Sequence, residues 1–407
     1  MRCLRAASSA PACSRSGDKR ARKRDAASAA ARALFLSFLG SPSEPYGSAR
    51  APLLLASLEN PTVPCALLNR FAARGSAAAY LAESAATAAT VRRVRGLPPQ
   101  LTALEWRAAG AAKFAPARAD ERGVLSAYHI DAGSLLAVAA LDPAPGASVL
   151  DMCAAPGGKS LALAQMLGPA GRLVSNDVSP DRRRRLRDVL SLYLPRGRVA
   201  DGGGTANDAD ADDAPAAPAV TIAGVDATRC GVLGSSAYDH VLLDAPCSSD
   251  RHMLRSPEKL AQWSPGCVRR NAARQAALLA VALDAVRPGG TVVYSTCALS
   301  RRENDDVVER TLARLPFAAT IVPLRCAFGE PTPIGAWHVL PDTAEGRGPL
   351  YLCKLVRGER AADARGDYSS EALEDEGGEA AAAAAAARPA AASHRSSAKA
   401  VGSDSII

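Results

Sequence analysis

The sequence predicts an α/β protein, built on a seven-stranded mixed sheet with helices on both faces. From about residue 128 onward, strand-like apolar runs alternate with helix-like runs, which is typical of strand–helix–strand units. A glycine-rich turn joins the first strand to the first helix, and several later strands are followed by Asp or Cys. With 407 residues, of which 48% are hydrophobic, the chain can bury one large core with appendages.

The elements of this sheet follow one another between residues 148 and 356. Each predicted strand is a short apolar run, and each predicted helix is a longer run of mixed polarity. The strands are expected at 148–152, 172–178, 219–225, 238–244, 290–296, 319–323 and 350–356. The main helices are expected at 159–167, 181–192, 267–286 and 303–315.

The first 26 residues are predicted to be an organellar targeting leader. Residues 1–25 are rich in Arg, Ser and Ala, and their only acids are Asp18 and Asp25. The first apolar run, 33–39, lies too far from the start for a secretory signal. Mitochondrial localisation is the first choice and a plastid is an alternative. The basic cluster 19–24 leaves nuclear localisation open as well.

Three other segments lie outside the predicted sheet. Residues 27–127 have an irregular helical pattern broken by prolines, and they are expected to form an N-terminal helical extension of a catalytic domain at 128–357. Residues 196–218 combine three consecutive glycines with an Asp/Ala/Pro mixture and are expected to form a disordered acidic insertion. Residues 358–407 include eight consecutive alanines and are expected to form a disordered, low-complexity tail.

The net charge of +8 is unevenly distributed. Residues 1–50 carry a net charge of +7, residues 358–407 carry −4, and the long middle part carries only +5. This charge is compatible with RNA binding without demonstrating it. No run approaches the roughly 18 consecutive apolar residues that span a bilayer, so no membrane association is expected. The ten cysteines form no C-x-x-C pair, which favours reduced thiols over a disulfide framework or a zinc site.

The glycine turn lies within 151–160, which reads Asp-Met-Cys-Ala-Ala-Pro-Gly-Gly-Lys-Ser. It is not a P-loop, because the position five residues before Gly158 is Cys153, and the dinucleotide pattern G-x-G-x-x-G is absent as well. We expect the glycines to let a ligand approach the backbone, and the following helix N-terminus to offer N–H groups to an anion.

Two acids at the ends of the next strands complete the predicted ligand site. Asp177 lies about twenty residues past the glycines, where an acid reaches ribose hydroxyls in such folds. Asp226 ends the third strand and could face an adenine amino group. Together they indicate an adenosine-containing ligand with a carboxylate, S-adenosylmethionine. The alternative, that each acid only caps a helix, explains one acid better than the set. Asp177 is expected to lie on the surface without core contacts.

Two cysteines are predicted to face this ligand from neighbouring strands. Cys247 follows the fourth strand, three residues after Asp244, and Cys297 follows the fifth. A lone cysteine in an apolar run is usually inert core. These two, however, lie just past strand ends, where side chains line the crevice of an α/β sheet. If the fourth and fifth strands are neighbours, about 4.8 Å apart, the thiols share one pocket.

This set of groups suits methylation of cytosine at C5. Cytosine C5 is a poor nucleophile, but attack of a thiolate at C6 turns C5 into an enamine-like carbon that accepts a methyl group. A carboxyl group at N3 hydrogen-bonds the ring and stabilises the developing charge. Two thiols and one carboxyl group therefore match attack, proton loss and product release.

Three motifs resemble those of the RsmB/Nop/Sun family of RNA cytosine-C5 methyltransferases, which implies a Rossmann-like S-adenosylmethionine-dependent methyltransferase domain. They are the glycine turn at 151–160, Asp-Ala-Pro-Cys-Ser at 244–248 and Tyr-Ser-Thr-Cys at 294–297. The similarity covers roughly 128–357 and, more weakly, 64–73. Residues 249–252 and 348–354 are most similar to the small mitochondrial members of the NSUN branch.

The resemblance implies a role for each motif residue. Cys297 would be the attacking nucleophile, Cys247 would assist product release, and Asp244 would contact the cytosine. The implied cofactor site consists of Cys153, Ala154, Ala155, Pro156, Gly157, Gly158, Lys159, Asp177, Arg182, Asp226 and Asp244. The sequence departs from the family pattern at Ala227 and in the insertion at 196–218, and no metal site is implied.

Two rival functions are less well supported. DNA cytosine methyltransferases pair a Pro-Cys thiol with Glu-Asn-Val, whereas here Glu303-Asn304 is followed by Asp305 and a Thr-Cys thiol is present, so no DNA partner is expected. A non-catalytic ribosome-assembly factor with this fold would need neither thiol. The expected substrate is organellar ribosomal RNA, with organellar transfer RNA as the alternative, and the cytosine flipped into the pocket. A protein partner that guides the chain to the ribosome would be compatible with this function.

Overall fold

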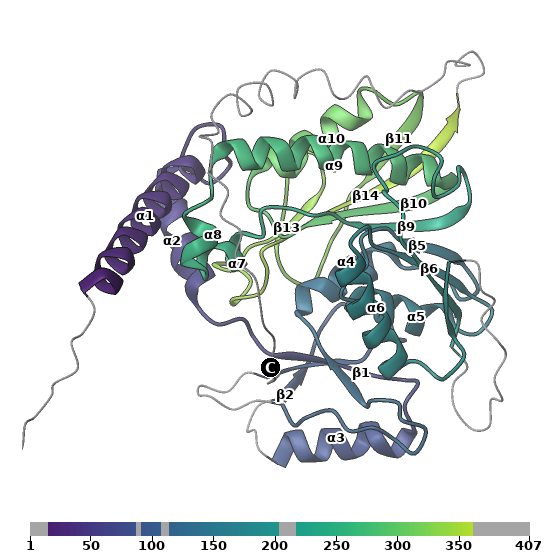
Figure 1. Ribbon diagram of the computed structural model, residues 1–407. Coiled ribbons are helices and arrows are strands. Elements are labelled where there is room, and N and C mark those ends of the chain that lie inside the picture. The colour runs from purple at the N-terminus through teal and green to yellow at the C-terminus, as the bar shows by residue number, and fades with distance from the viewer. Residues whose placement is uncertain (1–14, 87–90, 107–113, 203–216, 361–407) are drawn as a thin grey trace, which may run out of the picture. The chain divides into compact units, whose positions relative to one another are not determined.

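The computed structural model describes residues 15–86, 91–106, 114–202 and 217–360. Within them, a ten-stranded mixed sheet is covered by helices, and a separate four-stranded antiparallel sheet is formed by the N-terminal part of the chain (Figure 1). All seven strands predicted for the main sheet are present in it.

The large sheet has the strand order β12-β13-β14-β10-β9-β5-β6-β8-β7, and β11 also pairs with β14. The strands are β5 (Ser148–Asp151), β6 (Arg172–Asn176), β7 (Val199–Asp201), β8 (Ala219–Ala223), β9 (Tyr238–Asp244), β10 (Val286–Thr296), β11 (Phe317–Val322), β12 (Glu330–Pro331), β13 (Trp337–Val339) and β14 (Leu350–Arg360). Strands β8, β6, β5, β9 and β10 run parallel, and β14 is antiparallel to β10.

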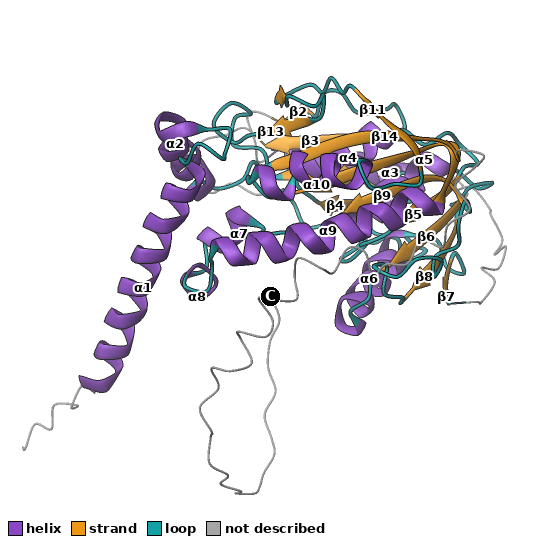
Figure 2. Ribbon diagram, turned by 90° about the horizontal axis from the view of Figure 1, so that it is seen from above, coloured by secondary structure: helices purple, strands orange, loops and turns teal. Residues whose placement is uncertain are grey.

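Helices cover both faces of this sheet (Figure 2). They are α4 (Ala132–Leu141), α5 (Gly158–Leu167), α6 (Pro180–Tyr193), α7 (Asp250–Leu254), α8 (Pro257–Leu260), α9 (Pro265–Ala285) and α10 (Asp305–Leu312), with a 3-10 turn at Arg301–Glu303. Alternate strand residues point to opposite faces. Val149 therefore packs in the core with α4, α5 and α6, and Leu150 packs in the core with α9 and α10.

The segment 27–127 is not purely helical, which corrects the expectation. It contains α2 (Gly47–Glu59), α3 (Arg74–Ala86), β1 (Cys65–Leu68), β2 (Val91–Arg93) and β3 (Ala103–Trp106), and these strands join β4 (Ala127–His129) in the order β2-β3-β1-β4. All four residues of β1 and of β3 are buried. Buried four-residue strands show no polar–apolar alternation, so periodicity alone does not identify them.

Other predicted boundaries lie inside or beside helices and strands of the structure. The predicted leader boundary at residue 26 falls inside α1 (Arg15–Leu39), and Phe35 and Leu39 of this helix are buried with Trp263. Within the predicted disordered insertion, Val199–Asp201 form the parallel edge strand β7, while 203–216 lie outside the described residues. Strand β14 extends to residue 360, and the rest of the predicted tail lies outside them too. In the described part of the chain, no helix has the length and apolar character needed to cross a membrane.

Candidate active site

The predicted functional side chains meet at one edge of the large sheet. Strands β5, β6, β8, β9 and β10 are parallel, so their carboxyl ends share that edge. Asp151 and Asp244 are the last residues of β5 and β9, and Asp177 and Cys297 directly follow β6 and β10. Asp226 lies three residues past the end of β8. The strand ends of an open α/β sheet are where such proteins bind ligands.

The two glycines of the turn are closely packed against other parts of the protein. Gly157 has φ of +118°, and a Cβ atom there would lie 3.1 Å from Leu186 and 3.2 Å from Val189 of α6. A Cβ atom on Gly158 would lie 2.6 Å from the Tyr128 ring. Because Gly157 is the N-cap of α5 and has no side chain, the first backbone N–H groups of α5 remain open to a ligand.

The remaining turn residues fix the shape of the loop. Ala154 and Ala155 are buried, Pro156 is exposed, and the Arg182 guanidinium donates a hydrogen bond to the Ala155 carbonyl oxygen at 2.8 Å. Burial raises the pKa of Cys153 to about 12, so this thiol remains protonated. Arg182 thus braces the turn from outside.

Asp177 is buried, which corrects the expectation of a surface acid. Only 3% of the residue is exposed. Its Oδ1 accepts a hydrogen bond from the Ser179 backbone N–H at 3.0 Å, and its Oδ2 forms an ion pair with Arg182 at 3.3 Å. Oδ2 has no hydrogen-bond donor among the described residues. The carboxylate therefore keeps an acceptor for a ligand while also supporting the start of α6.

Asn176, which the sequence analysis did not select, joins three strand ends. Its Nδ2 donates to the Met152 and Val225 carbonyl oxygens, each at 3.1 Å, and its Oδ1 accepts from the Val225 N–H at 2.9 Å. The residue is 1% exposed. The segments that follow β5, β6 and β8 are thereby held together. A polar residue at the end of an apolar strand, directly before Asp177, was the available sequence signal.

Asp226 is exposed and sits in a tight turn. Its Oδ1 accepts hydrogen bonds from the Thr228 N–H at 3.0 Å and the Thr228 hydroxyl at 2.8 Å. These bonds, the backbone one first, lower the pKa of Asp226 and keep it ionised. Because Asn176 holds Val225, Asp226 lies at the same strand-end edge as Asp177.

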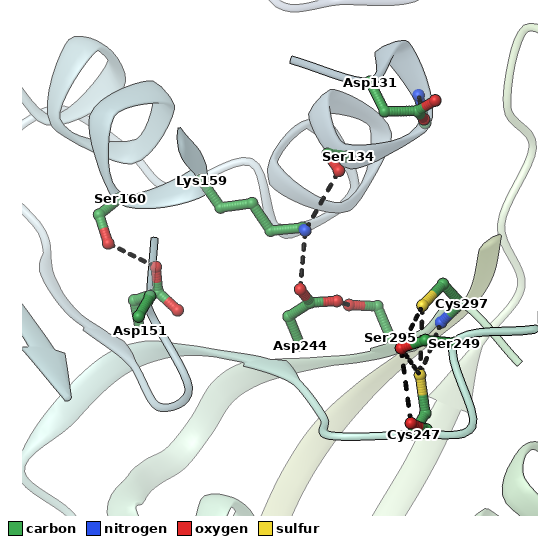
Figure 3. A network of polar contacts seen from close by, with 12 residues as sticks. Asp131, Ser134, Asp151, Lys159, Ser160, Asp244, Cys247, Ser249, Ser295 and Cys297 are labelled. Carbon is green, nitrogen blue, oxygen red and sulfur yellow. Dashed lines mark hydrogen bonds and ion pairs between the residues drawn. The ribbon is translucent and has the colours of Figure 1, made fainter. Parts of the chain in front are cut away.

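Lys159 and Asp244 form an ion pair in the middle of the site (Figure 3). Lys159 Nζ lies 2.7 Å from Asp244 Oδ2 and donates to the Ser134 hydroxyl at 3.2 Å, and the Ser295 hydroxyl donates to Asp244 Oδ1 at 2.9 Å. Burial alone would lower the pKa of Lys159, but the charge of Asp244 and its hydrogen bond raise it. Both oxygens of Asp244 are therefore held in fixed positions.

The two thiols lie side by side, as the strand order predicted. Strands β9 and β10 are neighbours, with Asp244 opposite Ser295, and the Sγ atoms of Cys247 and Cys297 are 3.3 Å apart. The Cys297 backbone N–H also donates to Cys247 Sγ at 3.4 Å. Figure 3 shows the pair next to Asp244 and Lys159. The two thiols and the Asp244 carboxylate therefore lie together at the ends of β9 and β10.

The surroundings make the two thiols unequal. The pKa of Cys297 is lowered, chiefly by the hydrogen bond from Cys247 and further by Ser249 and the charge of Lys159, against burial and the charge of Asp244. The pKa of Cys247 is raised well above its ordinary value by the same hydrogen bond, by burial and by the charges of Cys297 and Glu303. The contacts around the pair therefore favour ionisation of Cys297 over ionisation of Cys247.

Two buried acids that the sequence analysis did not assign to the site hold the cysteine loops. Glu303 accepts hydrogen bonds from the Ser248 N–H at 3.0 Å, from the Ser248 hydroxyl, and from Gln275 at 2.8 Å. Asp250 accepts from the Leu299 N–H at 2.7 Å, which ties the loop after β9 to the loop after β10. Burial raises the pKa of both acids. Sequence patterns do not reveal such long-range contacts.

These residues fit S-adenosylmethionine at the edge of β5, β6 and β8. The open N–H groups at the start of α5 suit a carboxylate, and exposed Asp226 suits a polar donor. Asp177 Oδ2, which pairs with Arg182 but accepts no hydrogen bond among the described residues, suits a hydroxyl group. The thiol pair lies on the other side, at β9 and β10. The predicted cofactor residues and the thiol pair thus lie along one strand-end edge.

The sequence model of the family described as 16S rRNA methyltransferase RsmB/F matches residues 138–197 and 216–355. The 5-cytosine rRNA methyltransferase NSUN4 of Xenopus tropicalis is 38% identical over 280 residues, which are 63% of this chain and 63% of that protein. NSUN4 of Bos taurus is 34% identical over 303 residues, 68% of this chain and 71% of that protein. The mitochondrial tRNA (cytosine(34)-C(5))-methyltransferase of Mus musculus is 32% identical over 266 residues, 62% and 70% of the two chains.

Two solved structures have a similar fold. A methyltransferase homolog protein from Pyrococcus horikoshii has a TM-score of 0.56 and 26% identity, and the match covers 77% of this chain and 92% of that one. NSun6 from Pyrococcus horikoshii with SFG has a TM-score of 0.59 and 17% identity, covering 80% and 97%. These neighbours confirm the predicted Rossmann-like methyltransferase fold.

Proposed function

Because this chain belongs to the 16S rRNA methyltransferase RsmB/F family, we propose that it methylates C5 of cytosine in RNA, with S-adenosylmethionine as the methyl donor. The observation that carries the proposal is the pair of thiols 3.3 Å apart beside the Lys159–Asp244 ion pair. The relatives named as 5-cytosine rRNA methyltransferases support ribosomal RNA as the substrate. The relative named as a mitochondrial tRNA methyltransferase supports transfer RNA as the second candidate and a mitochondrial location.

The cofactor would be held by the start of α5, by Asp177 and by Asp226. When bound, S-adenosylmethionine supplies the methyl group that C5 receives. This chain's own contribution is to hold the acceptor base and to activate it. Asp244 is held in place by Lys159 and Ser295 and would contact the cytosine ring. The ring would then lie between the cofactor residues and the thiol pair.

Cys297 is the nucleophile in this proposal, because its pKa is lowered and that of Cys247 is raised. The Cys297 thiolate forms a bond to C6, and the electron pair of the C5–C6 double bond moves to C5, which then accepts the methyl group. Loss of the C5 proton returns its electron pair to the ring and expels the Cys297 thiolate. Cys247, which keeps its proton and touches Cys297, assists this release.

The test is a methyl-transfer assay with the full-length protein, labelled S-adenosylmethionine and organellar RNA, followed by bisulfite sequencing. The wild type should methylate cytosine, and Cys297→Ala should neither methylate nor form a protein–RNA adduct. Cys247→Ala should accumulate an adduct, visible as a shifted band on a denaturing gel. Cys230→Ala, at an exposed cysteine that is not among the predicted site residues, serves as the matched control.

Two outcomes would contradict the proposal. An adduct with Cys297→Ala and none with Cys247→Ala would reverse the roles of the thiols, as in a DNA-type mechanism. No methylation of either ribosomal or transfer RNA by a wild type that binds both would favour a non-catalytic assembly factor. If only the transfer RNA fraction were methylated, transfer RNA and not ribosomal RNA would be the substrate.

A further inference from the structure

The hydroxyl group of Ser249 contacts both thiols of the pair. Cys297 Sγ donates to Ser249 Oγ at 3.5 Å, and Cys247 Sγ lies 3.8 Å from the same oxygen. The Ser249 hydroxyl itself donates to the Cys247 carbonyl oxygen at 3.5 Å. Figure 3 shows Ser249 beside both sulfur atoms. None of the sequence motifs gave this residue a chemical role.

The backbone conformation of Ser249 keeps its hydroxyl from capping helix α7. Ser249 precedes helix α7 as its N-cap, a position where serine normally accepts a hydrogen bond from a helix N–H. Here the residue has φ of +52° and ψ of +54°, and its side chain makes no capping bond. Non-glycine residues seldom adopt this left-handed region, and they do so mainly where the surrounding structure enforces it.

We propose that Ser249 is a positioning residue for Cys297, whose hydroxyl donates a hydrogen bond to the ionised Cys297 sulfur and so favours the thiolate. The inference rests on the proposed function for its use in methylation. The thiol chemistry itself, however, can be measured without RNA or cofactor.

The direction of this hydrogen bond follows from proton counting. A thiolate has no proton to donate, so the contact between Cys297 and Ser249 persists after ionisation only if the serine hydroxyl turns from the Cys247 carbonyl oxygen and donates to the sulfur. The neutral thiol needs no such donor, because it can donate to the hydroxyl oxygen instead. The hydrogen bond is stronger when its acceptor is charged, so it stabilises the ionised form preferentially.

The other charged and titratable groups around Cys297 do not replace this donor. Cys247 supplies the second hydrogen bond to the sulfur. The charge of Lys159 is favourable, but its ammonium group donates to Ser134 and Asp244. The charge of Asp244 opposes ionisation of Cys297, and Asp250 lies near enough for its own titration to be affected by Cys297.

The experiment measures alkylation of Cys297 by iodoacetamide between pH 5 and pH 10, with each cysteine peptide quantified by mass spectrometry. The variants are Ser249→Ala and Ser249→Gly. Both variants lack the hydroxyl. Glycine adopts a φ of +52° without strain, so the Ser249→Gly variant should fold even if Ser249→Ala does not. Ser236→Ala and Ser236→Gly are matched controls, because Ser236 is an exposed serine with φ of +54° outside the site.

Both Ser249 variants should shift the midpoint of Cys297 alkylation upward by about one pH unit, a tenfold change in the ionised fraction at a given pH. The Ser236 variants should leave it unchanged. An unchanged midpoint in both Ser249 variants would overturn the inference. A shift in Ser249→Ala alone would also overturn it, because that shift would reflect backbone strain instead of the lost hydroxyl. A wild type that methylates no RNA, together with an upward shift in both Ser249 variants, would refute the proposed function alone.

Discussion

Replacing Asp151 by Asn should stabilise the protein increasingly as the pH rises. Asp151 ends β5 and is fully buried. Its Oδ2 accepts a hydrogen bond from the Ser160 hydroxyl at 2.6 Å, whereas its Oδ1 has no hydrogen-bond donor among the described residues. Burial raises its pKa to about 7, against the Ser160 bond and the charge of Lys159. The structure therefore holds an acid that resists ionisation.

The sign and size of the effect follow from this pKa. Between the unfolded pKa of 3.8 and about 7, the folded protein binds more protons at Asp151 than the unfolded chain, so its free energy of unfolding falls as the pH rises. The full difference of about three pKa units corresponds to about 4 kcal/mol, of which about 2.5 kcal/mol develops between pH 5 and pH 8. An amide at this position does not titrate, so the free energy of unfolding of the Asp151→Asn variant does not fall with pH for this reason.

Urea unfolding of the wild type and Asp151→Asn at pH 5 and pH 8 measures the difference directly. The free energy of unfolding of the variant, relative to the wild type, should rise by about 2.5 kcal/mol from pH 5 to pH 8 and level off above pH 7. Asp188→Asn, at an exposed position on α6, is the control for loss of one charge. A relative stability that stays constant with pH, or falls, would show that Asp151 ionises normally in the folded protein.

Three further predictions concern neighbouring groups. Asn176→Ala should lower the free energy of unfolding, measured by urea titration, by about 3 kcal/mol or more, because it leaves three backbone groups without their hydrogen bonds. A loss below about 1 kcal/mol would mean that water replaces these hydrogen bonds. Lys159→Met should reduce methylation more than about tenfold by freeing Asp244, with activity at normal levels as the contrary result. Diamide should oxidise Cys247 and Cys297 to a disulfide, and itself be reduced, because the two sulfur atoms are only 3.3 Å apart. Peptide mapping without reductant would detect the linked peptides. Their absence would show that the two loops cannot move close enough for the bond to form.

The strands and motifs of the main sheet were predictable because their signals are local. Each predicted strand is an apolar run with turn residues at its ends, and β5, β9 and β10 lead directly into the three motifs. The expected meeting of Cys247 and Cys297 needed only the strand order, because adjacent parallel strands bring the residues after them together. By contrast, β1 and β3 were assigned to a helical extension, since short buried strands carry no periodic signal.

The amino-acid sequence by itself determined the fold class, the glycine turn and the pair of strand-end thiols, because each depends on residues close together in the chain. Only the tertiary structure decided which groups surround them. The Ser249 hydroxyl faces the thiols because of one left-handed backbone conformation, and Glu303 reaches Ser248 across 55 residues of chain. Asp177 is buried just before α6, where it pairs with Arg182. Burial, pKa and hydrogen-bond partners are properties of packing, and packing depends on contacts between segments that the local sequence does not encode.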